Sequence, residues 1–198
     1  MLEIQTLSQD KATALFSIKS IENIAKIEYT DDNELDSDIA GKIQQSVSTL
    51  EAYLNRSIVR RQLKVEKSFD RCEELEIDLP FPTHKSIDSV EKWNGTTWET
   101  LTSDYYTVTG LNQFTICFNK TWSTKTNERK YRVTYTAGWR RDETGSDALN
   151  ISIPDSQRLT QAVAEMVAGA YDGIAGMPVI GDRQRTALHD LVVPMSFG

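Results

Sequence analysis

The sequence is poor in the residues that bind metals or cross-link a chain. It holds two cysteines, Cys72 and Cys117, and two histidines, His84 and His189. Neither cysteine belongs to a C-x-x-C motif, and neither histidine lies in an H-x-x-x-H or H-E-x-x-H spacing, so no zinc site is indicated. We therefore expect free thiols that are buried or half-buried, with no metal and no cofactor.

Long apolar runs and clustered positive charges are also missing. No run approaches the roughly 20 residues that span a bilayer, and the first residues lack the basic stretch of a signal peptide, so we expect a cytoplasmic product without membrane contact. The 22 lysines and arginines are outnumbered by 29 aspartates and glutamates, giving a net charge of −7. This balance argues against gripping DNA through its phosphates, and it suits a surface past which DNA slides.

Catalytic fingerprints are absent too. No G-x-S-x-G, P-loop or Rossmann glycine pattern occurs, so nucleophilic, phosphoryl-transfer and hydride chemistry lack their usual carriers. The sequence predicts a protein that is not an enzyme and has no catalytic residues. A small hydrolase built from scattered Asp, Glu and His is an alternative, and it requires a pocket with shifted carboxylate pKa values.

Apolar spacing near the N-terminus predicts two helices. A stripe at intervals of three and four residues places a helix over residues 36–55; its members are Ile39, Ile43, Val47, Leu50 and Leu54. A shorter helix precedes it, with Ser20 as the expected N-cap and Ile21, Ile24 and Ile27 as its apolar stripe.

The C-terminal part predicts helices again. A second regular stripe follows the start signal at Pro154; its members are Leu159, Ala162, Val163, Met166, Val167 and Ala170. This helix should end near Gly173. A last helix is expected over residues 182–192, before Pro194 stops it.

Between the helical regions the pattern has period two, which is typical of strands with one buried face. The clearest case is residues 131–137, where Tyr, Val, Tyr and Ala alternate with Arg, Thr and Thr. Asn94-Gly95 suits a type I′ hairpin turn, which would set Trp93 opposite Thr96. Further strands are expected over residues 62–69, 75–79, 105–109 and 114–118.

These patterns predict an α+β fold in which N- and C-terminal helices pack as a small bundle, with an inserted antiparallel β domain that is a small sandwich or barrel. We assign residues 1–58 to an N-terminal segment and the first helices of the bundle. Residues 59–153 form the inserted β domain, residues 154–192 the C-terminal helices, and residues 193–198 an extended tail.

Four local strings occur in the order found in a known family. They are LEAYLNR at residues 50–56, LPFP and SIDSV at 79–90, VTYTAGW at 133–139 followed by Ile153-Pro154, and the Leu-rich turn at 188–194. In these the chain resembles the head-tail connector (adaptor, head completion) proteins of long-tailed bacteriophages and of phage-like gene transfer particles. The resemblance spans residues 20–194. The segment before Ser20 and the glycine-rich link at 173–181 depart from the family pattern.

The resemblance implies a structural protein of the virion neck, made in the host cytoplasm. Such a subunit docks on the portal protein as a homo-oligomeric ring of twelve copies. The ring extends the channel for double-stranded DNA, without sequence-specific binding, and offers a platform to the next neck protein, a stopper or tail terminator. The C-terminal tail of such relatives commonly reaches into the portal.

Two segments are candidate binding sites. The tail after the last helix contains apolar side chains, which are expected to be buried in a partner protein. The predicted portal-binding residues are Val193, Pro194, Met195, Phe197 and Gly198. The basic pair beside the strongest string is a candidate subunit interface, consisting of Trp139, Arg140 and Arg141.

A second class of function stays open. A β-rich virion module that binds a carbohydrate or a receptor would present exposed aromatic side chains, and the sequence has four tryptophans, Trp93, Trp98, Trp122 and Trp139. Core and interface packing is the favoured interpretation of these side chains.

Overall fold

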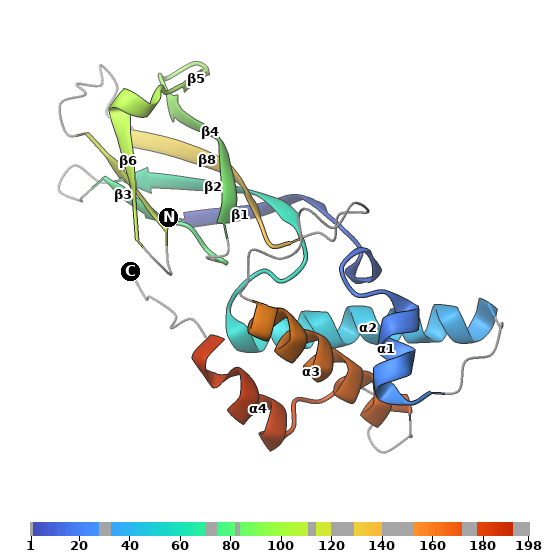
Figure 1. Cartoon of the computed structure of the whole chain (residues 1–198). Coiled ribbons are helices and arrows are strands. Elements are labelled where there is room, and N and C mark those ends of the chain that lie inside the picture. Colours follow the sequence, from blue (N-terminus) through green and yellow to red (C-terminus); the bar gives the residue numbers. More distant parts are fainter. Residues whose placement is uncertain are drawn as a thin grey trace. The chain divides into compact units, whose positions relative to one another are not determined.

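The computed structural model describes residues 2–27, 33–69, 75–81, 84–110, 114–119, 129–139, 153–171 and 178–191. The chain folds into two compact units (Figure 1). The β unit contains Met1–Gln9 and Arg60–Gly138, and the helical unit contains Asp10–Val59 and Trp139–Gly198. The predicted α+β class, with helices and an antiparallel β domain, is confirmed.

A five-stranded antiparallel sheet forms the larger layer of the β unit. Its strands, in spatial order, are β1 (Leu2–Gln9), β2 (Arg61–Phe69), β8 (Arg129–Ala137), β4 (His84–Trp93) and β5 (Trp98–Thr100). At its centre Val133 pairs with Val65 on one side and with Val90 on the other. All three are at most 1% exposed. Period-two alternation therefore directs one face of each central strand into the core.

A three-stranded antiparallel sheet forms the second layer. Its order is β3 (Glu76–Asp78), β7 (Thr115–Phe118) and β6 (Tyr106–Thr109), and a short 3-10 turn, η2 (Ser103–Tyr105), precedes β6. Residues of both sheets share one apolar cluster. The rings of Phe118 and Tyr131 meet across it with centroids 4.1 Å apart. The β unit is thus a small sandwich.

The β4–β5 hairpin differs from the predicted type I′ turn. Trp93 pairs with Trp98, not with Thr96, and Gly95 has φ 102° whereas Asn94 is not among the residues with positive φ. The side chain of Asn94 explains the longer loop, because its Oδ1 accepts hydrogen bonds from the backbone amides of Thr96 and Thr97, each at 2.9 Å. This local side-chain bonding favours a four-residue turn.

The helical unit consists of short and long helices around one apolar cluster. Its elements are η1 (Ala12–Ala14), α1 (Ile18–Ala25), α2 (Asn33–Leu54), α3 (Ile153–Tyr171), α4 (Asp182–Leu188) and η3 (His189–Leu191). The five residues of the predicted α2 stripe are all 0% exposed. The six of the α3 stripe are buried as well, so both amphipathic helices supply the core as their spacing predicts.

The N-cap of α1 is Ser17, so the prediction of Ser20 was wrong. Ser17 has extended backbone angles, and its Oγ accepts a hydrogen bond from the backbone amide of Ser20 at 3.2 Å. A serine three residues ahead of another fits the N-cap position equally well by sequence, and Ser17 begins the helix one turn earlier. Ile21 is buried as expected, whereas Ile24 is 37% exposed.

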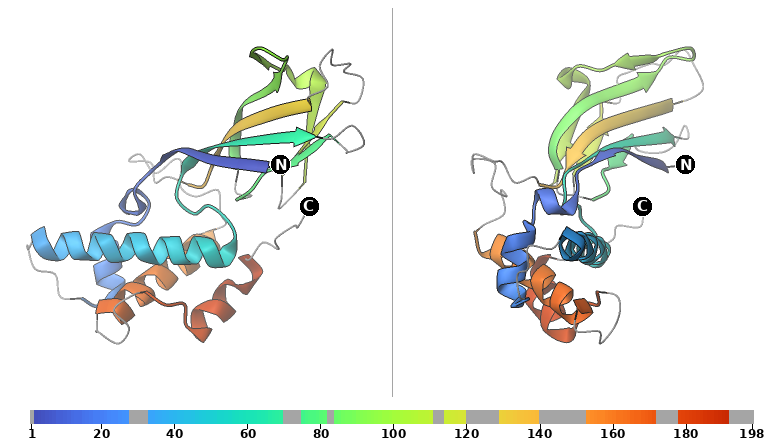
Figure 2. Two further views of the ribbon diagram at one scale, coloured as in Figure 1. Left: turned by 180° about the vertical axis from the view of Figure 1, so that it is seen from behind. Right: turned by 90° about the vertical axis from the view of Figure 1, so that its right-hand side faces the viewer.

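The N-terminal segment contributes a strand that the sequence analysis did not anticipate. Residues 1–58 were assigned to an N-terminal segment and the first helices, whereas β1 lies along the edge of β2 (Figure 2). Ile4 is opposite Val65. Leu2, Ile4 and Thr6 alternate with Glu3 and Gln5 as a strand requires. The partner strand lies about 60 residues away in the chain, beyond the reach of local patterns.

Candidate interaction surfaces

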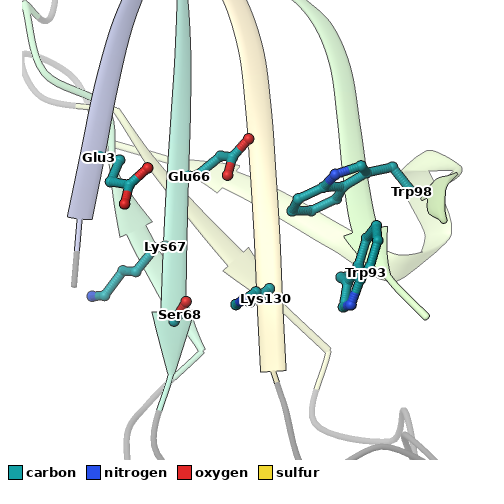
Figure 3. A pocket seen from close by; sticks show the side chains of 7 residues that line it. All are labelled: Glu3, Glu66, Lys67, Ser68, Trp93, Trp98 and Lys130. Atoms are coloured by element: carbon teal, nitrogen blue, oxygen red, sulfur yellow. The ribbon is translucent and has the colours of Figure 1, made fainter. Parts of the chain in front are cut away.

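A hollow of about 480 Å³ lies on the five-stranded sheet (Figure 3). It is lined by Glu3, Glu66, Lys67, Ser68, Lys130, Trp93 and Trp98. The two tryptophans stand at one side and the carboxylates of Glu3 and Glu66 at the other. These two carboxylates face one another across the β1–β2 ladder, and Lys64 Nζ lies 3.8 Å from Glu66 Oε1, so that Glu66 already has a positive charge beside it.

An ion pair organises the tryptophan side of this surface. Arg132 on β8 binds Glu91 on β4 through two hydrogen bonds, from Nε to Oε2 at 2.5 Å and from Nη2 to Oε1 at 2.8 Å. These hydrogen bonds hold the pKa of Glu91 below its usual value. The Arg132 guanidinium also lies over the Trp98 ring, 4.5 Å from its centroid, and the Trp93 and Trp98 rings are 5.4 Å apart.

This arrangement bears on the carbohydrate alternative. A sugar stacks on an aromatic face that is free, whereas one face of Trp98 is already covered by Arg132. Trp93 and Trp98 are half-buried and contact each other. Packing within the sheet surface therefore accounts for both rings.

A second hollow, of about 420 Å³, lies between α3 and α4. Its lining includes Gln157, Arg158, Gln161, Ala162, Glu165, Arg183, Gln184 and Ala187. Arg158 binds Asp190 through both guanidinium nitrogens, which lowers the pKa of that carboxyl. Gln184 donates a hydrogen bond to Glu165 Oε2 at 2.7 Å. Gln161 also donates to Glu165, and Arg183 lies 3.8 Å from it. Glu165 thus links both helices, an arrangement typical of a helix-helix seam.

Trp139, a predicted interface residue, lies where the chain re-enters the helical unit. Its backbone amide donates to the carbonyl of Ile58 at 2.9 Å, and it forms a parallel bridge with Val59. Its side chain is half-buried and packs against the helical core. Arg140 and Arg141 lie outside the described residues, so the basic part of that candidate interface stays a prediction.

Glu51 is a structural carboxylate that the sequence analysis did not single out. It is 7% exposed, and its Oε1 accepts hydrogen bonds from the backbone amides of Ile58 at 2.7 Å and Val59 at 3.0 Å. It thereby fixes the chain just after α2, where Asn55 adopts a positive φ of 51°. The available signal was its position beside the buried stripe residues Leu50 and Leu54, since a charged residue there needs a partner.

Two further ionisable side chains, those of Cys117 and Tyr135, have raised pKa values. Cys117 is a free, half-buried thiol whose pKa is raised by burial, whereas Cys72 lies outside the described residues. Burial also raises the pKa of Tyr135, whose hydroxyl donates to the Pro80 carbonyl. In the part of the chain that the structure describes, no three His, Cys, Asp or Glu side chains gather as metal ligands, and no helix has the length and apolarity to cross a membrane.

The predicted portal-binding tail, residues 193–198, falls outside the described residues. Its residues Val193, Pro194, Met195, Phe197 and Gly198 therefore remain a prediction from sequence.

Comparison with known proteins relates the fold to virus-like particles. No protein-family model matches the sequence, and no curated protein does. Solved structures do match, over nearly the whole length of both chains. A chain from the neck of an empty gene transfer agent particle, computed with C6 symmetry, superposes with a TM-score of 0.69 at 11% sequence identity, covering 99% of this chain and 98% of that chain.

Two further structures give the same picture. A chain of the virion of a native gene transfer agent particle has a TM-score of 0.67 at 9% identity, with 98% of each chain covered. A chain of the native particle's neck, computed with C12 symmetry, has a TM-score of 0.64 at 10% identity, with 99% of this chain and 98% of that chain covered. The protein thus shares its whole fold, both units included, with chains of these particles, as the resemblance implies.

Proposed function

We propose that the protein is a structural subunit of a virion neck, an adaptor that forms a ring between the portal and the next neck protein. The observation that carries this proposal is the similarity of fold to a neck chain over 99% of the present chain and 98% of the other. Both the helical unit and the inserted β sandwich take part in that match. A shared single domain would be weaker support, because one fold serves many functions.

The ring is the second part of the proposal. Neck structures computed with C6 and C12 symmetry contain chains of this fold, which supports a ring of twelve copies. A closed ring of identical subunits needs one patch of each subunit to meet a different patch of its neighbour. The net charge of −7 suits a channel through which double-stranded DNA passes without being held.

The third part concerns the portal. The tail residues Val193, Pro194, Met195, Phe197 and Gly198 would insert into the portal, and Trp139, Arg140 and Arg141 would contact a neighbouring subunit. Each buried Val, Met or Phe side chain contributes about 1.5 to 3 kcal/mol. Twelve weak attachments on one ring act together through their high effective concentration. In this function the protein performs no chemistry.

Co-sedimentation with the cognate portal rings tests the proposal, with negative-stain microscopy of the mixture. Wild-type protein should form a ring on one end of the portal. A chain that ends at Val193 should lose binding while keeping its circular dichroism spectrum and its melting temperature. Wild-type protein that never joins the portal would overturn the adaptor role, and a truncated chain that binds as strongly as wild type would overturn only the role of the tail.

A further inference from the structure

The edge strand β1 exposes apolar side chains on the face of the sheet that forms the core. Ile4 lies directly opposite Val65, and Thr6 opposite Leu63, so that these residues share one face. Val65 and Leu63 are 0% exposed, whereas Ile4 is 48% and Leu2 is 47% exposed. The apolar face of the sandwich therefore continues past its own core onto β1.

The smaller size of the second sheet explains this exposure. The Nζ atom of Lys67 on β2 donates to the carbonyl of Glu76 on β3 at 3.0 Å, which places the end strand β3 beside β2. Three strands oppose five, and every residue of β1 is exposed. We call Leu2 and Ile4 the β1 rim.

The other end of the sandwich carries a second rim. On the edge strand β6, Val108 lies opposite Ile116, and the two share the core face. Ile116 is 0% exposed, whereas Val108 is 42% exposed. Tyr106, two residues earlier on the same face, lies opposite the buried Phe118 and is half-buried. We call Tyr106 and Val108 the β6 rim.

Both edge strands lack the charges that usually protect such edges. Strand β1 contains one charged residue, Glu3, and β6 contains none. Strand β1 has a register shift between Thr6 and Ser8, which lies beyond the β1 rim. Natural sheets commonly place lysine, proline or bulges on open edges to prevent pairing with other chains. Neither strand contains a lysine or a proline, as expected of edges that meet a partner.

We propose that the β1 rim of one copy packs against the β6 rim of the next copy, so that subunits join head to tail through their β units. The two rims are different surfaces and belong to edge strands of different sheets, as a heterologous interface requires. This inference rests on the proposed function, because a ring supplies each rim with the other. It names a subunit contact separate from Trp139, Arg140 and Arg141.

Charge placed in the rims tests the contact. The variants are Ile4→Asp, Val108→Lys and the chain that carries both, assembled on cognate portal rings. Burial of an isoleucine contributes enough that its loss, with a charge in its place, should raise the concentration for half-maximal ring formation about tenfold or more. In the double variant each interface joins an aspartate to a lysine, so ring formation should recover.

Matched controls lie on the opposite face of the same strands. Gln5→Asp adds the same charge as Ile4→Asp, but Gln5 pairs with Lys64 on the outer face. Thr107→Lys corresponds to Val108→Lys, since Thr107 lies opposite Cys117. Both controls should form rings as the wild type does, and melting curves establish that every variant is folded.

Each outcome separates the two proposals. Rings of Ile4→Asp at wild-type concentration would overturn the rim contact and leave the adaptor role intact. Loss of rings in both single variants without recovery in the double variant would show that the rims do not meet each other. Wild-type protein that forms no ring on the portal removes the adaptor role and the rim contact together.

Discussion

The β unit and the helical unit differ in what each leaves unsatisfied. The β unit exposes apolar side chains of its core face at both edges, at Ile4 and Val108. The helical unit buries a carboxylate instead: Glu22 is 1% exposed, and neither of its oxygens has a hydrogen-bond partner in the described part of the chain. Contact with another protein surface would bury the exposed apolar side chains. Protonation would neutralise the buried Glu22 carboxylate. The comparison suggests assembly through the β unit and pH sensitivity in the helical unit.

The largest expected effect contrasts an isoleucine from each unit. Ile43→Ala opens a cavity in the helical core, where Ile43 is 0% exposed, and should cost about 2–5 kcal/mol of unfolding free energy. Ile4→Ala removes a side chain that is 48% exposed and should cost less than about 1 kcal/mol. Urea unfolding of both variants measures the difference. Equal losses would mean that β1 is covered within the isolated chain.

The next effect concerns the carboxylate that ends α2. Glu51→Ala leaves the buried amides of Ile58 and Val59 without their acceptor, and should lower the unfolding free energy by about 2–3 kcal/mol. Glu51→Gln keeps an oxygen at the same place and serves as the control. Hydrogen exchange should show faster exchange of these two amides in the alanine variant alone. Unchanged exchange there would remove Glu51 from this role.

A smaller effect is expected at the sandwich core. Tyr135→Phe deletes the hydroxyl that donates to the Pro80 carbonyl, and should cost about 1 kcal/mol. The control is Tyr53→Phe, at a tyrosine whose hydroxyl makes a long, exposed hydrogen bond of 3.5 Å to the Arg185 carbonyl. Thermal unfolding should lower the melting temperature of the first variant more than that of the second. Equal shifts would show that the hydroxyl of Tyr135 adds nothing to stability.

The smallest effect depends on pH. Burial, with the nearby Asp36 carboxylate adding to it, raises the pKa of Glu22 above the ordinary value of a glutamate. The folded state therefore holds this proton more tightly than the unfolded state, so the contribution of Glu22 to stability is largest at low pH and is lost as the pH rises through the raised pKa. Glu22→Gln should remove that loss.

Denaturant unfolding at a series of pH values from 4 upwards measures this effect. The unfolding free energy of Glu22→Gln minus that of the wild type should increase with pH. Glu3→Gln, at an exposed position in β1, controls for the change in net charge. A difference that stays constant across the series would show that Glu22 does not titrate differently in the two states.

The periodicity of apolar residues predicted those helices and strands whose formation depends on residues close together in the sequence. The α2 stripe from Ile39 to Leu54 and the alternation around Val133 each need only a few neighbouring residues to be read, and both are buried as predicted. Strand β1 was missed because its partner strand β2 lies about 60 residues away in the chain. The hairpin was misassigned because hydrogen bonds of the Asn94 side chain, and not the Asn-Gly pair alone, set the loop length.

The candidate surfaces were harder to predict for the same reason. Arg132 and Glu91 are 41 residues apart, and only the register of β4 on β8 brings them together over Trp98. The exposure of Ile4 depends on how many strands the opposite sheet contains, which no stretch of sequence encodes. The resemblance to connector proteins implied the ring, but it did not indicate which edges of the sandwich are left open.

The proximity of Val59 and Trp139 in the helical unit allows the segment between them to be removed or replaced. Val59 and Trp139 form a parallel bridge. The Trp139 amide donates a hydrogen bond to the Ile58 carbonyl, and the Val59 amide donates one to the Glu51 carboxylate. The residues at which the chain leaves and re-enters the helical unit, Val59 and Trp139, are therefore held close together. Segments whose ends meet in this way tolerate exchange of everything between them. A short linker from Val59 to Trp139, together with removal of residues 1–9, would leave the helical unit alone, and a foreign sequence could be inserted between the same two residues.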